Sequence, residues 1–241
     1  MTSKIAKIIG FCDKLTTRVI IAFFALILCV SLYAVYDAIC IHNQTRTIGE
    51  ASKIIEGVPD DSRIAELKKT NEEIVAWVKI DDTAIDYPVT QTSNNQFYLS
   101  HDYKRDYSIA GSIFADYRSN LQKDDYSVIY GHNMNGDAMF GEINKFEDSS
   151  YFNKHALGSV YLEGAHYEAE VLDYAIIASD NEYVYDLDHV ANGANAEILA
   201  HIVEKSVNHN SSASSYNTLM LLSTCYLHSS QRAVLLMGYN K

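Results

Sequence analysis

Hydrophobic residues are concentrated in one uninterrupted run near the N-terminus. Every residue from 19 to 36 is apolar or aromatic except Ser31. As an α-helix this run rises about 27 Å, at roughly 1.5 Å per residue, and extension to Ile41 gives enough length to cross a hydrocarbon core of about 30 Å. No polar face recurs at helical spacing. The pattern therefore favours a membrane-spanning helix over a buried core helix or a cleaved signal peptide.

The charged residues around this run predict its orientation. The basic residues that precede it are Lys4, Lys7, Lys14 and Arg18. An excess of Lys and Arg marks the cytoplasmic side of a membrane helix. We therefore expect residues 1–18 to form a cytoplasmic basic tail and residues 19–41 an uncleaved, single-pass signal anchor in the cell membrane. The rest of the chain is then extracellular.

A helical pattern continues after the anchor. Apolar residues recur at helical spacing between residues 42 and 69, with an interruption at Gly57, Val58 and Pro59. Residues 60–62 are all good helix N-caps. We expect a stalk helix, a break, and a second helix, so that residues 42–73 form a helical stalk and N-terminal helices.

From residue 74 onward the pattern changes to short β-type runs separated by turn signals. The candidate strands are residues 76–80, 85–90, 112–115, 127–130, 159–163, 168–179, 218–223 and 233–239. Eight strands without regular helices between them favour an antiparallel sheet closed into a barrel over a doubly wound α/β fold. Residues 74–241 are therefore expected to form one mostly β domain.

Two helical segments interrupt the strands. Residues 139–152 predict one or two short helices, and residues 194–208 predict an amphipathic helix with Ile198, Ile202 and Val203 on one face. This second helix is expected to cap the barrel or to form the wall of a groove. Residues 209–215 are expected to be a polar loop before the last two strands.

The charge balance excludes one class of partner. The chain has 31 acidic and 19 basic residues and a net charge of −12. A nucleic-acid-binding protein needs a basic surface to neutralise phosphates. Residues 42–241 hold 29 of the acidic residues and 15 of the basic ones, so this part of the chain is also expected to stay away from anionic surfaces.

One cysteine lies outside the membrane region and its flanks. Cys12, Cys29 and Cys40 lie in or beside the apolar run, and Cys225 is the remaining cysteine of the four. A single exported thiol cannot form an internal disulfide. Cys225 is therefore either a small buried hydrophobic residue or a reactive nucleophile.

Three residues with suitable chemistry stand at the ends of predicted strands. His132 follows the run VIYG, Cys225 ends the run LMLLSTC, and Arg232 opens the final strand. This set has the parts for covalent acyl transfer: a cysteine attacks, a histidine moves protons, and a fixed cation stabilises the oxyanion. The pairs Asp124-Asp125 and His101-Asp102 lack metal-ligand spacing, so we expect no metal site and no cofactor.

These runs carry a resemblance to a known family. They read IVAWVKI, IDYPVTQ, GSIFADYR, YGHNM, MFGEI, LLSTC and RAVLL. The chain resembles the sortases, which are membrane-anchored cysteine transpeptidases of Gram-positive bacteria, and among them it is similar to class B. The resemblance implies a closed eight-stranded barrel with N-terminal helices. It also implies that the helix at 194–208 is the helical insert before the penultimate strand.

The resemblance also implies roles for individual residues. Cys225 would be the nucleophile, His132 the general acid and base, and Arg232 the cation that binds the oxyanion or orients the substrate. The implied substrate-binding residues are Asn95, Leu99, Ser179, Tyr183, Val184 and Ser223. Only six residues separate Cys225 from Arg232, a shorter interval than in some class B members, and His228 lies among them.

The activity implied is cleavage of a sorting signal at the C-terminus of a secreted protein, of the type NPxTx or related PxTx, after its Thr. The acyl group would pass to an amine of a peptidoglycan precursor or to a pilin lysine. Two alternatives stay open at this point. The first is a cysteine peptidase that only hydrolyses its target. The second is a membrane-tethered β-barrel binding module without catalytic activity, in which Cys225 is a buried structural residue.

Overall fold

The computed structural model describes residues 2–188, 195–210, 215–225 and 230–241. By internal contacts it separates into two units, Met1–His42 and Asn43–Lys241. In the first unit, the segment Asp13–Ile39 of helix α1 (Thr2–Ile54) is long and apolar enough to cross a membrane, and its most apolar window is not buried by other parts of the chain. Among the described residues it is therefore not a core helix.

The second unit begins with the last turns of α1, followed by a turn and two short helices. These are η1 (Asp60–Ser62) and α2 (Arg63–Lys68). The predicted break before residue 60 is confirmed, and Gly57 adopts a φ of +73° there. Ile64 and Leu67 of α2 and Ala51 of α1 are fully buried in a cluster with Trp77. This apolar contact fixes the N-terminal helices on the sheet.

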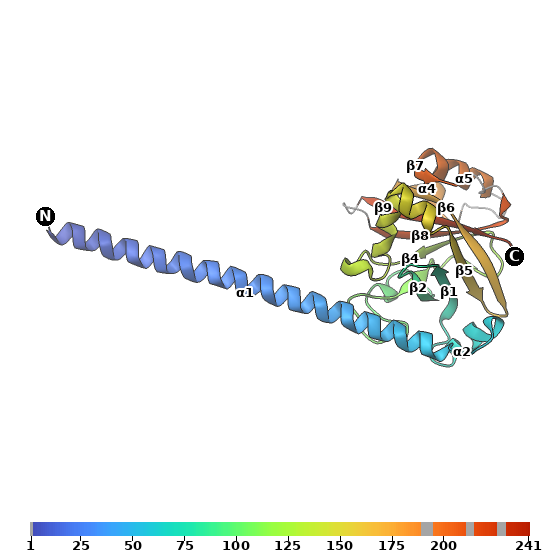
Figure 1. The fold of residues 1–241 in the computed structure, drawn as a ribbon, viewed down its shortest axis with the longest axis horizontal. Helices are drawn as coiled ribbons and strands as arrows, with labels where there is room; N and C mark the ends of the chain where they lie inside the picture. The colour runs from blue at the N-terminus through green and yellow to red at the C-terminus, as the bar shows by residue number, and fades with distance from the viewer. Residues whose placement is uncertain (1, 189–194, 211–214, 226–229) are drawn as a thin grey trace. The chain divides into compact units, whose positions relative to one another are not determined.

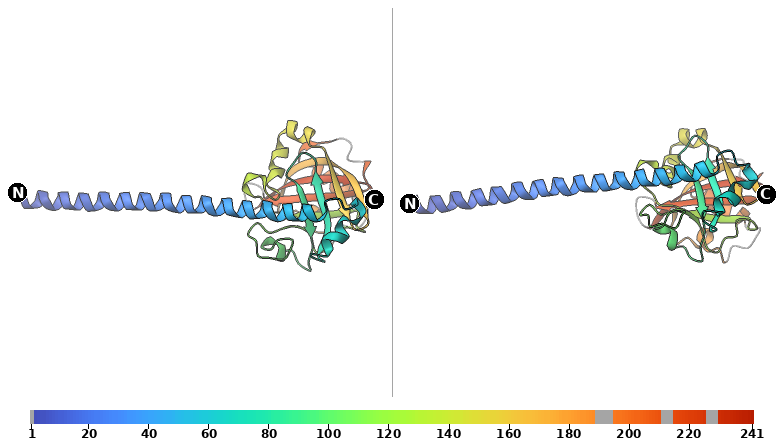
Figure 2. Two further views of the ribbon diagram at one scale, coloured as in Figure 1. Left: turned by 60° about the horizontal axis from the view of Figure 1, so that its bottom comes forward. Right: turned by 90° about the horizontal axis from the view of Figure 1, so that it is seen from below.

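Within the described ranges, nine strands form one sheet. They are β1 (Ile74–Ile80), β2 (Asp86–Thr90), β3 (Ile113–Ala115), β4 (Tyr126–Tyr130), β5 (Leu157–Leu162), β6 (Ala165–Ala178), β7 (Ser206–His209), β8 (Thr218–Cys225) and β9 (Gln231–Tyr239). Their spatial order is β5-β1-β2-β3-β4-β8-β9-β6-β7, and β5 also pairs with β6. Eight strands therefore close into a barrel (Figure 1; Figure 2), as predicted.

The expectation of an antiparallel barrel is wrong at two places. β2 pairs with β3 in parallel, and β4 pairs with β8 in parallel. The alternation of apolar and polar residues shows which face of a strand is buried, but it contains no information about the neighbouring strand or its direction. Long connections join both parallel pairs, which parallel neighbours require.

The helical segments follow the predicted positions with one correction. η4 (Gly141–Glu147) and α3 (Ser149–Lys154) occupy the first segment, and α5 (Asn195–Glu204) occupies the second. The predicted helix at 194–208 is wrong at its end, because residues 206–209 form β7. Ser206 and His209 both hydrogen-bond to the Asp173 carboxylate, at 2.9 and 2.8 Å, and this tertiary anchor overrides the helical pattern. The other short helices are η2 (Phe97–Leu99), η3 (Asn135–Asp137) and α4 (Glu182–Tyr185).

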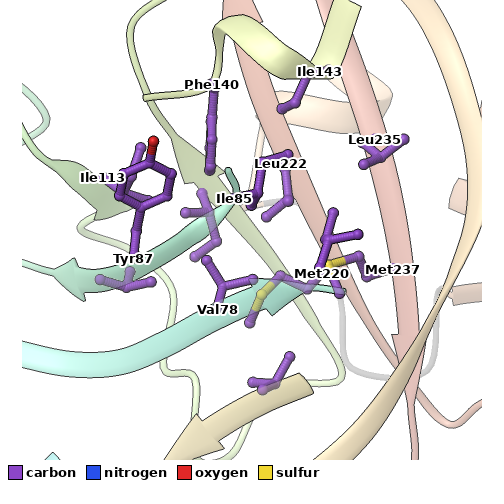
Figure 3. Packing of buried hydrophobic residues seen from close by; sticks show 14 of the residues in the cluster. Val78, Ile85, Tyr87, Ile113, Phe140, Ile143, Met220, Leu222, Leu235 and Met237 are labelled. Carbon is purple, nitrogen blue, oxygen red and sulfur yellow. The ribbon is translucent and has the colours of Figure 1, made fainter. Parts of the chain in front are cut away.

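Two apolar layers explain the long hydrophobic runs of the last strands. Inside the barrel, residues such as Val78, Met220 and Leu235 pack against Phe140 and Ile143 of the segment around η4 (Figure 3). The opposite faces of β8 and β9 form a second cluster with α5, which includes Ile198 and Ile202. Strands that are buried on both faces read as continuous apolar sequence rather than as alternation.

Candidate active site

The parallel pairing of β4 and β8 places two chemically important residues at equivalent positions. Tyr130 of β4 is opposite Ser223 of β8, and the Gly131 N–H donates to the Ser223 carbonyl at 3.2 Å. His132 therefore lies two residues after Tyr130, and Cys225 lies two residues after Ser223. Both are at the same edge of the sheet. Two strands that run in the same direction bring their C-terminal ends to one edge.

The third residue belongs to the next strand of the barrel. β9 pairs with β8 in antiparallel direction, and Arg232 is the partner of Cys225 in that register. His132, Cys225 and Arg232 thus belong to three neighbouring chain segments, although 93 positions separate the histidine from the cysteine. The side chain of Cys225 and residues 226–229, which include His228, lie outside the described part of the structure.

A cleft of about 300 Å³ opens at this edge. Its lining residues come from β3, β4, β8, β9 and the loops beside them. They are Asn95, Leu99, Phe114, Asp116, Arg118, Tyr130, Gly131, His132, Ser179, Tyr185, Ser223, Thr224 and Arg232. The cleft is therefore a mixed surface, with aromatic walls and several convergent hydrogen-bonding groups, of the kind that binds a ligand in a defined orientation.

One nitrogen of the His132 imidazole has a fixed partner. Its Nε2 lies 2.8 Å from the carbonyl oxygen of Leu99. A carbonyl only accepts, so Nε2 carries a proton and donates it in this arrangement. In the neutral ring, Nδ1 is then the nitrogen without a hydrogen, because the hydrogen bond of one ring nitrogen selects the tautomer of the other.

The floor of the cleft holds a pair of hydroxyl groups. The Tyr185 hydroxyl and the Ser223 Oγ lie 2.9 Å apart, and Ser223 is almost completely buried. The Tyr185 ring stacks beside Tyr130, with 6.4 Å between ring centroids. The hydroxyl contact joins α4 to β8, which carries Cys225, and the ring contact joins α4 to β4.

A buried ion pair lies directly beside these groups. Arg118 Nε and Nη2 donate to the two carboxylate oxygens of Asp116 at 2.9 and 3.0 Å, and the side chain of Asp116 is fully buried. Burial alone raises the pKa of Asp116, but the hydrogen bonds from Arg118 and Asn95 outweigh it and hold that pKa below its usual value. The same pair raises the pKa of the Arg118 guanidinium.

Four of the six predicted substrate-binding residues line the cleft, namely Asn95, Leu99, Ser179 and Ser223. The other two lie elsewhere. Tyr183 is 69% exposed and its ring stacks on His201 of α5. Val184 is fully buried in the cluster beneath α5, and its carbonyl accepts from the Tyr126 hydroxyl at 3.0 Å. Neither side chain belongs to the cleft lining.

Known proteins share sequence and fold with this chain. Residues 78–237 match the sortase domain family. The chain belongs to the sortase family. It is 35% identical to sortase B of Listeria monocytogenes over 153 residues, which are 60% of this chain and 61% of that protein. The matched part is thus less than two thirds of that relative's length.

Solved structures of sortases have the same fold. Sortase B from Bacillus anthracis in complex with AAEK2 is 28% identical, with a TM-score of 0.72, and covers 83% of this chain and 97% of its own. Spy0129 of Streptococcus pyogenes, a class B sortase involved in pilus biogenesis, is 31% identical, with a TM-score of 0.63, and covers 73% of this chain and 96% of its own. The predicted resemblance to class B sortases is confirmed.

Sequence reasoning missed four polar residues of this sortase's cleft. Asp116 and Arg118 lie in the run GSIFADYR, which contributed only to the family resemblance, and Tyr130 and Tyr185 read as strand and loop aromatics. An acidic residue directly after a fully apolar strand, two positions before an arginine, was the available signal. Within the described residues no group of three or more His, Cys, Asp or Glu side chains could hold a metal ion.

Proposed function

We propose that the protein is a membrane-anchored cysteine transpeptidase that cleaves a C-terminal sorting signal after its Thr and transfers the acyl group to an amine. The observation that carries this proposal is the register of three neighbouring strands. It places His132 and Cys225 at equal offsets on β4 and β8, and it pairs Cys225 with Arg232 on β9. Membership in the sortase family supports the same reaction.

The first half of the reaction forms an acyl-enzyme. The Cys225 thiol gives its proton to His132, its sulfur attacks the carbonyl carbon of the Thr in the sorting signal, and a tetrahedral oxyanion forms. The carbon–nitrogen bond then breaks, His132 donates a proton to the departing amine, and a thioester to Cys225 remains. Arg232 would stabilise the oxyanion or orient the peptide, since its guanidinium stays charged and presents several donors.

The second half releases the product. A primary amine attacks the thioester carbonyl, His132 accepts the proton that the amine loses, and the sulfur of Cys225 departs as the new amide forms. His132 thus alternates between acid and base, as microscopic reversibility requires. If water replaced the amine, the same site would act as a peptidase.

The cleft supports a peptide substrate. We infer that the segment before the cleaved bond lies along Asn95, Leu99, Ser179 and Ser223. We propose a signal of the NPxTx or related PxTx type. The acceptor would be an amine of a peptidoglycan precursor or a pilin lysine. The similar Streptococcus pyogenes protein is involved in pilus biogenesis, which supports the pilin lysine as a candidate acceptor.

The N-terminal segment supports a location at the cell membrane. We propose that residues 1–18 form the cytoplasmic tail, residues 19–41 the anchor, residues 42–73 the stalk and N-terminal helices, and residues 74–241 the extracellular catalytic barrel. The apolar segment Asp13–Ile39 and the basic residues before and at its start support this arrangement. A protease added outside intact cells should then digest the barrel and spare the tail.

The experiment that tests the reaction uses the full chain in detergent micelles. It is incubated with a pool of Pro-x-Thr-x pentapeptides and a small primary amine, and both protein and peptides are followed by mass spectrometry. We expect an acyl adduct on Cys225 and an amine-exchanged peptide, and we expect Cys225→Ala to give neither. Full activity of Cys225→Ala would refute the proposal. Cleavage without exchange would favour a peptidase, and the absence of any adduct would favour a binding module.

A further inference from the structure

Asp116 accepts hydrogen bonds from an unusual number of donors. Its Oδ1 accepts from the backbone N–H and the Nε of Arg118, at 3.0 and 2.9 Å. Its Oδ2 accepts from Arg118 Nη2 at 3.0 Å, Asn95 Nδ2 at 2.8 Å and the Tyr130 hydroxyl at 3.0 Å. Five donors thus saturate one fully buried carboxylate, and all three residues that supply them line the cleft.

Stability alone is a weak reason for such a pair. The cost of removing two charges from water offsets much of their attraction, and apolar residues of similar size often stabilise a core as well or better. What an ion pair adds is direction, because a bidentate guanidinium–carboxylate contact fixes the orientation of both groups. This pair orients two parts of the cleft lining.

The first is Asn95. Its Nδ2 donates to Asp116 Oδ2, and its Oδ1 accepts from the Tyr117 backbone N–H at 2.9 Å. Because an ionised carboxylate only accepts and a backbone N–H only donates, the amide of Asn95 cannot flip. One N–H of that amide is used by Asp116, and the second is available to a ligand in the cleft.

The second is the segment that carries α4. Arg118 Nη2 also donates to the Tyr185 carbonyl at 2.7 Å, and its Nη1 lies 3.7 Å from the Asp186 carboxylate. Tyr185 in turn contacts Ser223 through its hydroxyl. One ion pair therefore holds two cleft-lining segments that are about 90 positions apart in the chain, the loop with Asn95 and the segment with Tyr185.

We propose that Asp116 and Arg118 are positioning residues for the peptide substrate: they lock the Asn95 amide so that its second N–H donates to a backbone carbonyl of the sorting signal, and they hold Tyr185 and Ser223 at a fixed place beside it. Neither residue touches the reacting atoms. This inference rests on the proposed function and concerns how the same cleft binds its peptide.

The test separates peptide binding from chemistry. Binding of the Pro-x-Thr-x pool to the full-length Cys225→Ala chain in micelles is measured by equilibrium dialysis and mass spectrometry, with and without Asp116→Asn. We expect Asp116→Asn to raise the Kd of every peptide that binds by at least about tenfold. On the chain with Cys225 intact, the same substitution should raise KM and leave kcat and the rate of iodoacetamide alkylation of Cys225 within about threefold.

A double-mutant cycle tests whether the effect passes through Asn95. In an Asn95→Ala background, Asp116→Asn should change the Kd by less than about threefold, because the amide that it orients is absent. Arg118→Lys keeps the charge but loses the planar fork, and it should raise the Kd by an intermediate factor in a chain that folds. Asp60→Asn, which breaks the Asp60–Arg63 ion pair in the N-terminal helices, is the matched control and should leave the Kd unchanged.

Three results would overturn the inference: an unchanged Kd in Asp116→Asn, a lower kcat and slower alkylation with an unchanged KM, or additive effects in the cycle. Failure of the proposed function looks different. A wild-type chain that binds the peptides but forms no adduct would refute transpeptidation and leave the binding test in force. A wild-type chain that binds none of the peptides would overturn both the positioning role of Asp116 and Arg118 and the proposed function.

Discussion

Gly131 lies directly before His132, where the backbone is in close contact with side chains of the barrel core. A Cβ atom at this position would lie 2.4 Å from the Ile113 Cδ1 and 2.7 Å from the Phe140 ring. Both neighbours are buried in the barrel core and have little room to move. The glycine is therefore required by close packing, directly before the proposed acid and base.

Gly131→Ala should displace His132 from the cleft edge. We expect a loss of about 1–3 kcal/mol in the free energy of unfolding, as overpacking usually gives, and a fall in adduct formation of more than tenfold. Gly49→Ala is the matched control, since a Cβ there has no neighbour within 4 Å. Intact-mass labelling with the peptide pool measures the effect. Equal labelling of the two variants would show that the position of residue 132 does not depend on this contact.

Arg232 is the second residue whose chemistry can be isolated. Arg232→Lys preserves the charge and replaces a planar group with a point charge. We expect the rate of acyl transfer to fall by at least about tenfold, because a fixed donor to the oxyanion contributes on that scale or more. Single-turnover kinetics of the thioester adduct measures it, with Arg63→Lys in the N-terminal helices as control. An unchanged rate would remove Arg232 from the mechanism.

At the scale of elements, the strands were predictable because they alternate or are largely apolar over three to fourteen residues. All eight barrel strands fall on predicted runs, with ends that differ by a few residues. β7 was not predictable, since residues 206–209 continue a helical pattern and form a strand only through Asp173 of β6. Neither was the parallel pairing of β4 with β8, because register between strands so distant in the chain arises from barrel closure.

The same limit applies to the candidate site. His132, Cys225 and Arg232 could be selected because a thiol, an imidazole and a guanidinium at strand ends together fit one reaction, whereas each of them alone is more often a structural or solvated residue. Asp116 and Arg118 could not, because a charged pair in a short interval is usually a solvated turn. Their importance comes from their hydrogen bonds to Asn95 and Tyr185. Those two residues belong to distant parts of the chain, so only the fold brings them to the ion pair.

The ion pair that links β3 to the end of α4 should affect stability in a pH-dependent way. The folded state holds the pKa of Asp116 below its usual value. Its ionised form therefore stabilises the fold fully above the unfolded pKa of about 3.9, and this stability is lost as the pH falls through the lowered pKa.

We expect Asp116→Asn to lower the free energy of unfolding by about 3 kcal/mol at pH 7, because it leaves the Arg118 charge without its carboxylate. The difference between wild type and variant should stay constant from pH 7 to pH 5 and shrink below about pH 4. Urea unfolding followed by near-ultraviolet circular dichroism, repeated across this pH range, measures it. A difference that grows as the pH falls would contradict the assignment of a lowered pKa.

At the scale of the whole molecule, the apolar segment and the cleft belong to different units of the chain. The apolar segment Asp13–Ile39 has the composition of an anchor, and the compact unit Asn43–Lys241 holds the cleft. That unit carries most of the negative charge, with 29 acidic and 15 basic residues after position 41. A cationic amine acceptor is thus favoured electrostatically over an anionic one at this surface.

The position of β9 at the C-terminal end of the barrel has a consequence for biosynthesis. β9 supplies Arg232 and pairs with both β8 and β6, so the barrel cannot close before residues 231–239 are made. Synthesis proceeds from the N-terminus, and a ribosome adds about 5–20 residues per second. The nascent chain therefore carries its histidine, and later its cysteine, without a finished cleft.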